Sequence, residues 1–238
     1  MTRESTEKTF QGLLDFQRIL ESRAYGAPVF WVDAPLYYHS NRGLPAFYAR
    51  LTTAAPQPFL LYNDPDFIGA LSRPLKRNNI RTAVLKELCR NTRVAGLVFR
   101  GNLDRARNYQ RAVRSRDHFR IYDGSETHFL QHPSMSGVVS VGANLDAGKW
   151  HEATRFSLMT GGPSADYPGT LEQALQLGAY LRRLGEIYEN AAVPVIKAAL
   201  FRMGVIESPA CLDYREDAEE KGRRIMEMME RGPAAEMR

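Results

Sequence analysis

Two short apolar segments with a helix-forming stretch between them constrain the fold more than any other feature of this chain. Phe59–Tyr62 and Val94–Phe99 are each too short for a buried helix, and polar or turn-forming residues follow both directly. The stretch between them, Asn79–Arg90, carries apolar residues at helical spacing. Strands that alternate with helices are typical of a parallel sheet. The polar residues after both strands then meet at the carboxyl-terminal edge of the sheet, where ligands bind in such folds.

The rest of the chain extends this alternation. We predict further strands at Val29–Asp33, Phe119–Tyr122 and Gly137–Val141, which gives about five parallel strands in total. Helices are predicted around them at Thr6–Ser22, Pro45–Thr53, Leu103–Val113, Thr127–His132 and Lys149–Met159. Beyond Gly161 the pattern is helical, over Thr170–Glu189, Pro194–Gly204 and Tyr214–Arg231. We therefore predict an α/β domain over residues 1–160 and a helical extension over residues 161–238.

The composition excludes several classes of protein. With 44% hydrophobic and 25% charged residues, the chain has the balance of a globular domain. Its apolar runs are far below the roughly 20 residues needed to span a membrane, and its first residues lack a secretory signal pattern. The cysteines, Cys89 and Cys211, form neither a metal-binding pair nor a disulfide framework. We therefore expect a cytoplasmic protein with no membrane partner.

The charge and the motifs argue against nucleic-acid, nucleotide and metal binding. The net charge is +5, but the arginines are scattered through every segment, which favours solvated helix faces over a nucleic-acid surface. No GxGxxG or GxxxxGK[ST] motif follows a predicted strand, so we predict no nucleotide cofactor. His128 and His132 have a spacing that can hold a metal, but no third ligand follows at a telling spacing, and we predict no metal site.

Six segments in order resemble the dihydrodipicolinate synthase / N-acetylneuraminate lyase family. They are P-L-Y-Y with R-G-L, L-Y-N-D-P, V-A-G-L-V, Y-D-G-S-E, G-V-V-S-V-G-A-N and P-V-I-K-A-A-L-F-R-M-G-V-I. The resemblance covers nearly the whole chain and implies a (β/α)8 TIM barrel with a C-terminal helical extension, assembled as a homo-oligomer (dimer or tetramer). It also implies a lyase of the class I aldolase type. In such enzymes a lysine at the end of the sixth strand forms a Schiff base with pyruvate or another 2-oxo acid.

Carried over by position, the resemblance implies a set of site residues. Tyr62 matches the family's catalytic tyrosine, whose phenol hydrogen-bonds the keto acid and moves a proton. Tyr37 or Tyr38 matches a tyrosine that reaches a neighbouring subunit's site; the loop length leaves the choice open, and we take Tyr37 as the candidate. The implied substrate-binding positions are Asn63, Gly124, Ser125, Val139 and Gly142.

Departures from the family pattern bear on activity. Val98 stands where the resemblance places the Schiff-base lysine, and valine has no amine with which to form an imine. Lys86, in V-L-K-E-L, imitates the lysine motif, but its place on the polar face of a predicted helix indicates a solvated side chain. Phe67 stands where dihydrodipicolinate synthases have an arginine that holds a substrate carboxylate.

The start of the chain is a further departure. The chain begins at the family's third helix, so we expect the first three barrel strands, and the hydroxyl loop that binds the keto acid's carboxylate, to be missing. Either the true start lies upstream, or this is a truncated, divergent member whose open sheet edges are covered by a partner or by its own helices.

Two hypotheses therefore remain. The chain is a lyase for a 2-oxo acid in which Tyr62 transfers the proton without a lysine imine, or it is a non-catalytic pseudoenzyme that binds a ligand or supports an assembly. Arg100 lies two residues after Val98 and so on the same side of the strand. It can bind an anionic ligand or a structural carboxylate.

Overall fold

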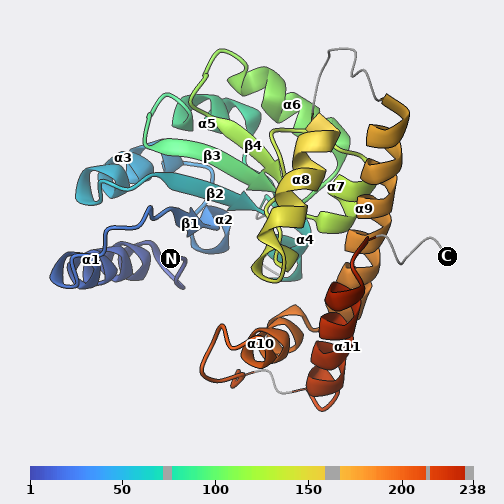
Figure 1. The fold of residues 1–238 in the computed structure, drawn as a ribbon. Helices are drawn as coiled ribbons and strands as arrows, with labels where there is room; N and C mark the ends of the chain where they lie inside the picture. Colours follow the sequence, from blue (N-terminus) through green and yellow to red (C-terminus); the bar gives the residue numbers. More distant parts are fainter. Residues whose placement is uncertain (72–76, 159–166, 213–214, 234–238) are drawn as a thin grey trace. The chain divides into compact units, whose positions relative to one another are not determined.

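The structure, a computed structural model, describes residues 1–71, 77–158, 167–212 and 215–233. They form two compact units, Met1–Gly124 and Ser125–Arg238 (Figure 1). The domain boundary predicted near residue 160 falls in residues 159–166, outside the described part of the chain, and it stays a prediction.

The first unit is built on a parallel sheet. Its four strands lie in the order β1 (Trp31–Asp33), β2 (Phe59–Asn63), β3 (Val94–Phe99) and β4 (Arg120–Asp123). The helices of this unit are α1 (Thr6–Ser22), α2 (Pro35–Tyr38), α3 (Leu44–Ala54), α4 (Pro65–Ala70), α5 (Thr82–Leu88) and α6 (Leu103–Val113). An α/β fold with a parallel four-stranded sheet is consistent with part of a (β/α)8 barrel.

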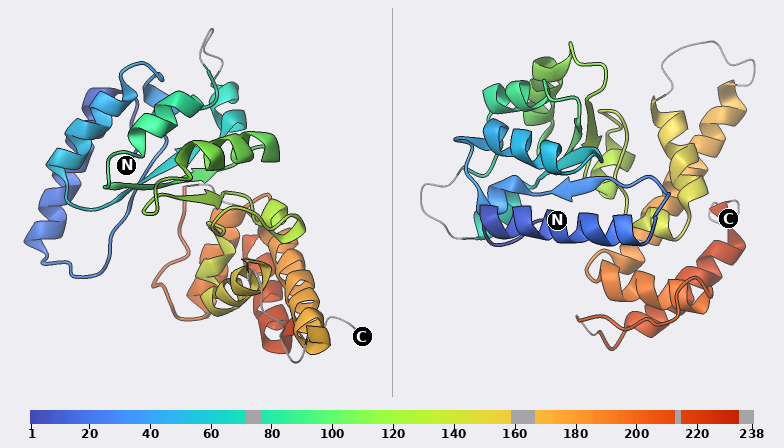
Figure 2. Two further views of the ribbon diagram at one scale, coloured as in Figure 1. Left: turned by 90° about the horizontal axis from the view of Figure 1, so that it is seen from above. Right: turned by 90° about the vertical axis from the view of Figure 1, so that its left-hand side faces the viewer.

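Helices α3, α5 and α6 lie along one face of this sheet (Figures 1 and 2). Asn63, Phe99 and Asp123 are neighbours in the strand register and share that face. Phe99 packs edge-on against Tyr109 of α6, with 5.2 Å between ring centroids. Because side chains alternate along a strand, the next row points to the opposite face. This second row consists of Tyr62, Val98 and Tyr122.

Local signals explain where the helices of the first unit begin. Ser5 caps α1, and its hydroxyl oxygen accepts the N–H of Lys8 at 3.2 Å. Asn102 caps α6 in the same way through the N–H of Arg105 at 2.9 Å. The predicted helix Thr6–Ser22 is confirmed residue for residue. The short helices α2 and α4 lie in stretches for which we predicted no helix.

The second unit is helical. It contains α7 (Glu126–Gln131), the 3₁₀ turn η1 (Gly142–Asn144), α8 (Ala147–Leu158), α9 (Tyr167–Tyr188), α10 (Ala192–Arg202) and α11 (Ala218–Arg231). Its core includes the buried side chains of Phe129, Trp150, Leu177, Leu181, Leu184, Tyr188, Val195 and Ile225. Helices α10 and α11 approach closely because Gly222 faces Ala198: a Cβ at Gly222 would lie 3.0 Å from that of Ala198.

The predicted fifth strand, Gly137–Val141, is wrong. Apart from an isolated β-bridge at Val138, this segment is irregular. Side chains hold the backbone directly after this segment, at the start of η1. The Ser140 hydroxyl oxygen accepts the N–H of Ala143 at 2.9 Å, and Glu126 accepts the N–H of Gly142 at 2.7 Å. The chain therefore turns into η1, and the sheet of the described residues has four strands.

Within the described ranges, every helix is too short or too polar to cross a lipid bilayer.

Candidate functional site

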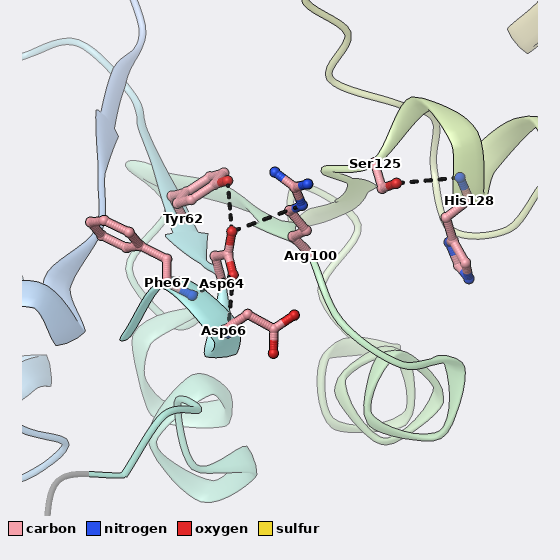
Figure 3. A network of polar contacts seen from close by, with 7 residues as sticks. All are labelled: Tyr62, Asp64, Asp66, Phe67, Arg100, Ser125 and His128. Carbon is pink, nitrogen blue, oxygen red and sulfur yellow. Dashed lines mark hydrogen bonds and ion pairs between the residues drawn. The ribbon is translucent and has the colours of Figure 1, made fainter. Parts of the chain in front are cut away.

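The carboxyl-terminal ends of β2 and β3 bring three polar side chains together (Figure 3). The Tyr62 hydroxyl donates to Asp64 Oδ2 at 3.4 Å, and Arg100 Nε lies 3.9 Å from the same oxygen. The other Asp64 oxygen accepts the N–H groups of Asp66 and Phe67 at 3.1 and 3.0 Å, which caps α4. Both contacts to Oδ2 are long, so Tyr62 and Arg100 can exchange them for contacts with a ligand.

The surroundings of Tyr62 keep its phenol protonated. Burial raises the pKa of Tyr62, and the negative charge of Asp64 raises it further. The positive charge of Arg100, and a hydrogen bond from it, act on this pKa in the opposite direction but do not outweigh burial. At neutral pH, Tyr62 is therefore a hydrogen-bond donor rather than a tyrosinate base.

Val98 provides an apolar surface beside this phenol. It pairs with Tyr62 in the register of β2 and β3, and only 2% of it is exposed. A Cβ at Gly124 would lie 3.3 Å from a methyl group of Val98. None of the lysines in the described ranges hydrogen-bonds Tyr62, and Lys76 lies outside those ranges.

Asn63, predicted to bind substrate, is engaged with the backbone that precedes α5. Its side-chain oxygen accepts the N–H of Ile80 at 2.8 Å, and its nitrogen donates to the carbonyl of Asn78 at 3.2 Å. The Tyr109 hydroxyl lies 3.4 Å from the same Asn63 oxygen and donates to the Ile80 carbonyl at 2.7 Å. These contacts account for a buried Asn63 without a ligand.

The two tyrosines of α2 have different surroundings. Tyr38 donates to Asp33 Oδ2 at 2.7 Å, and burial together with the charge of Asp33 raises the pKa of Tyr38 well above its ordinary value. Tyr37 stacks on Phe67, with 5.8 Å between centroids and an interplanar angle of 8°. Phe67 lies in α4, whose N-cap is Asp64, so this ring contact connects Tyr37 to the helix that begins after Asp64.

Asp33 is the centre of a network that the sequence did not reveal. It is fully buried and also accepts the hydroxyls of Thr2 and Tyr48, each at 2.6 Å. The Thr2 hydroxyl oxygen in turn accepts the N–H of Ala34 at 2.8 Å. In the sequence, the available signal for this network was an acidic residue at the end of an apolar strand. Because its acceptor sites are taken by hydroxyl donors of the protein, Asp33 holds the end of β1 in place.

The remaining predicted residues fall at the start of the second unit and near η1. Ser125 caps α7, and its hydroxyl oxygen accepts the N–H of His128 at 3.3 Å (Figure 3). Val139 is 47% exposed. The backbone at Gly142 is held by Glu126, which also accepts the hydroxyls of Ser140 at 2.6 Å and Tyr188 at 2.7 Å.

The structure adds Tyr122 and Asp64 to the residues at the strand ends. Tyr122 flanks Val98 on the side opposite Tyr62. The sequence signal for Tyr122 was its position two residues before Gly124, because side chains alternate along a strand and residues two apart share a face. The rings of His128 and His132 meet edge-on with 5.9 Å between centroids. Over the residues that the structure describes, no group of three or more His, Cys, Asp or Glu side chains could hold a metal ion.

Solved structures similar to this chain include dihydrodipicolinate synthases. A monomeric dihydrodipicolinate synthase variant has 19% identity and a TM-score of 0.69, covering 96% of this chain and 72% of its own. The 4-hydroxy-tetrahydrodipicolinate synthase of Methylacidiphilum fumariolicum SolV has 21% identity and a TM-score of 0.67, covering 97% and 72%. YagE of E. coli K12, solved in complex with pyruvate, has 15% identity and a TM-score of 0.65, covering 95% and 72%.

Curated protein sequences gave no match. The sequence profile of the dihydrodipicolinate synthetase family, in contrast, matches residues 20–230, which include most of both compact units. This chain therefore belongs to the dihydrodipicolinate synthetase family.

Proposed function

We propose that this chain is an aldolase-type lyase of its family and takes a pyruvate-type 2-oxo acid at the carboxyl-terminal ends of β2 and β3. Family membership supports a lyase or aldolase-like function. The observation that carries the proposal is the half-buried Tyr62 hydroxyl beside the exposed guanidinium of Arg100, above the apolar Val98. A 2-oxo acid has a carbonyl and a carboxylate on adjacent carbons, which such a pair can bind together.

Each side chain has a role that follows from its chemistry. Tyr62, whose pKa is raised by burial, donates a hydrogen bond to the keto oxygen and can pass it a proton. Arg100 presents a planar fork of N–H donors that matches a carboxylate. Tyr37 flanks the proposed site through its stacking on Phe67, and Gly124 is a further substrate-binding position beside Val98. Asn63 faces the opposite side of the sheet, and Ser125, Val139 and Gly142 lie in the second unit; their substrate-binding roles stay predictions from the resemblance.

Val98 determines which chemistry the proposal allows. An imine needs an amine, so no Schiff base can form at this position. The substrate is therefore held without a covalent bond, unless a lysine elsewhere in the chain enters the site. The same valine favours the second candidate, a ligand-binding or assembly subunit that performs no chemistry. Binding of the keto acid is common to the lyase and to a ligand-binding subunit, and turnover separates them.

Calorimetry with pyruvate tests the binding. We expect saturable binding that weakens by about tenfold in Tyr62→Phe, which removes a hydrogen bond to the keto oxygen, and in Arg100→Gln, which removes a charged contact with the carboxylate. The matched controls are Tyr25→Phe and Arg107→Gln, which change exposed side chains of the same unit. Equal binding by all four variants would exclude this site.

Borohydride reduction in the presence of pyruvate, followed by mass spectrometry, tests the chemistry. We expect no adduct on any lysine, and an adduct would show that an imine forms elsewhere. Val98→Lys, checked for folding by circular dichroism, is expected to gain a trapped adduct if the rest of the pocket is intact. We also propose a homo-oligomer, dimer or tetramer, which sedimentation velocity would measure.

A further inference from the structure

A second candidate site lies in the first unit, between the loop after α2 and the segment before α5. It is a cavity of about 440 Å³ whose lining includes Ser40, Asn41, Arg42, Arg77 and Arg81. The remaining wall is apolar, from Leu36 and Val84. Three arginines thus line one cavity, and none of its described lining residues carries a carboxylate; its volume is of the size that small-molecule sites have.

The backbone that carries these arginines is held by buried amides. Asn41, 8% exposed, accepts the N–H of Arg81 at 2.7 Å and donates to the carbonyl of Asn79 at 3.1 Å. Asn63 fixes the same segment from the other side through the N–H of Ile80 at 2.8 Å. The loop after α2 is therefore tied to the segment before α5, and the positions of Arg42 and Arg81 are set relative to each other.

The loop that carries Arg42 is also ordered by its own contacts. The N–H of Arg42 donates to the Ser40 hydroxyl oxygen at 3.2 Å, and His39 stacks on Phe47 with 5.4 Å between centroids. The chain then enters α3 through Gly43, at a φ of 77°, a conformation that favours glycine. This part of the cavity wall is thus a loop whose conformation is fixed by its own contacts.

No ion pair within the described part of the chain balances the charges of the three arginines. Across the described residues, none of Arg42, Arg77 and Arg81 forms an ion pair with an acidic side chain. Like charges held around one cavity repel each other, and an anion that enters removes this repulsion. Guanidinium groups suit oxyanions because their N–H donors pair with two oxygens at once.

We propose that this cavity binds a small multivalent oxyanion of the phosphate-ester class. A phosphate group carries a charge of about −1.5 to −2 at pH 7 and three acceptor oxygens, which matches several converging guanidiniums. The apolar wall at Leu36 and Val84 can accommodate the carbon skeleton of an organic phosphate. The site shares no side chain with Tyr62, Asp64 and Arg100, so it is separate from the proposed keto-acid site.

The test is calorimetric titration of the full chain with pyrophosphate, at constant ionic strength set with chloride. We expect saturable binding to one site, weakened by about tenfold to a hundredfold in Arg42→Gln, Arg77→Gln and Arg81→Gln. Arg81→Lys keeps the positive charge but loses the planar set of N–H donors. Its affinity for pyrophosphate should fall between those of the unaltered protein and Arg81→Gln. Arg107→Gln, the same charge change on exposed α6, should alter the affinity less than about twofold.

Three results would overturn the proposal. Absence of saturable binding up to about 10 mM pyrophosphate would show that the arginines are simply solvated. An equal loss in Arg107→Gln would show that the protein's overall positive charge, and not the cavity, attracts the anion. Citrate, titrated in parallel, carries a similar charge on planar carboxylates, and binding as tight as that of pyrophosphate would exclude the phosphate class.

Discussion

Replacing Gly142 with alanine should destabilise the second unit by about 2–4 kcal/mol. The new Cβ would lie 2.2 Å from the Tyr188 hydroxyl and 2.9 Å from Trp150 Nε1. Ordinary contacts begin near 3.4 Å, so the Tyr188 hydroxyl must move by roughly 1 Å. That hydroxyl donates to Glu126 at 2.7 Å, and the carboxylate also holds the N–H of Gly142 itself.

The magnitude follows from two costs. Overpacking a dense core costs about 1–3 kcal/mol, and losing a hydrogen bond to a charged acceptor costs about 1.5–3 kcal/mol. The two share one side chain, so they overlap and do not add in full. Gly178→Ala is the matched control: a Cβ there meets nothing within 4 Å. Since Gly178 lies inside α9, alanine should stabilise the helix by up to about 1 kcal/mol.

Urea unfolding of variants in a Trp31→Phe background, followed by Trp150 fluorescence and far-ultraviolet circular dichroism, measures both free energies. Tyr188→Phe removes the hydroxyl that the new methyl would strike. The double variant Gly142→Ala, Tyr188→Phe should therefore lose clearly less stability than the sum of the two single variants. The reasoning fails if Gly142→Ala costs less than about 0.5 kcal/mol, or if the two changes are additive.

Further predictions concern the first unit. Asp33→Ala leaves three hydroxyls without their acceptor and should cost about 3–5 kcal/mol, whereas Asp15→Ala on the exposed face of α1 should cost less than about 1 kcal/mol; equal losses in urea unfolding would refute the role of the Asp33 network. Burial raises the pKa of Tyr48 and of Tyr109 well above the ordinary value, and the charge of Asp33 adds to the rise for Tyr48. The unfolded chain therefore loses these protons first, and the free energy of unfolding should fall above pH 10 by about 1.4 kcal/mol per pH unit for each tyrosine. In urea unfolding between pH 9 and 11, Tyr109→Phe should reduce this slope and Tyr25→Phe, an exposed control, should not; an unchanged slope in Tyr109→Phe would contradict the prediction.

The sequence by itself determined the elements whose signals are local. The apolar runs at Phe59–Tyr62 and Val94–Phe99 and the polar turns after them placed β2 and β3 correctly, and the helical spacing over Thr6–Ser22 placed α1. The ordered motifs also identified the family, because a series of short matches in one order is specific even when each match is weak. Tyr62 and Arg100 were correctly assigned to neighbouring strand ends, since parallel strands deliver their carboxyl ends to one edge.

Only the tertiary structure decided how side chains far apart in the chain share their partners. Gly137–Val141 has the composition of a strand, yet Glu126 and Ser140 bind the backbone at η1 instead. The amide of Asn63, predicted from the sequence to bind substrate, hydrogen-bonds a segment more than a dozen residues away. A sequence pattern records which face a residue occupies. Which donor meets which acceptor depends on the packing of distant segments, and for this chain that packing set the roles of Asp33, Asn63 and Glu126.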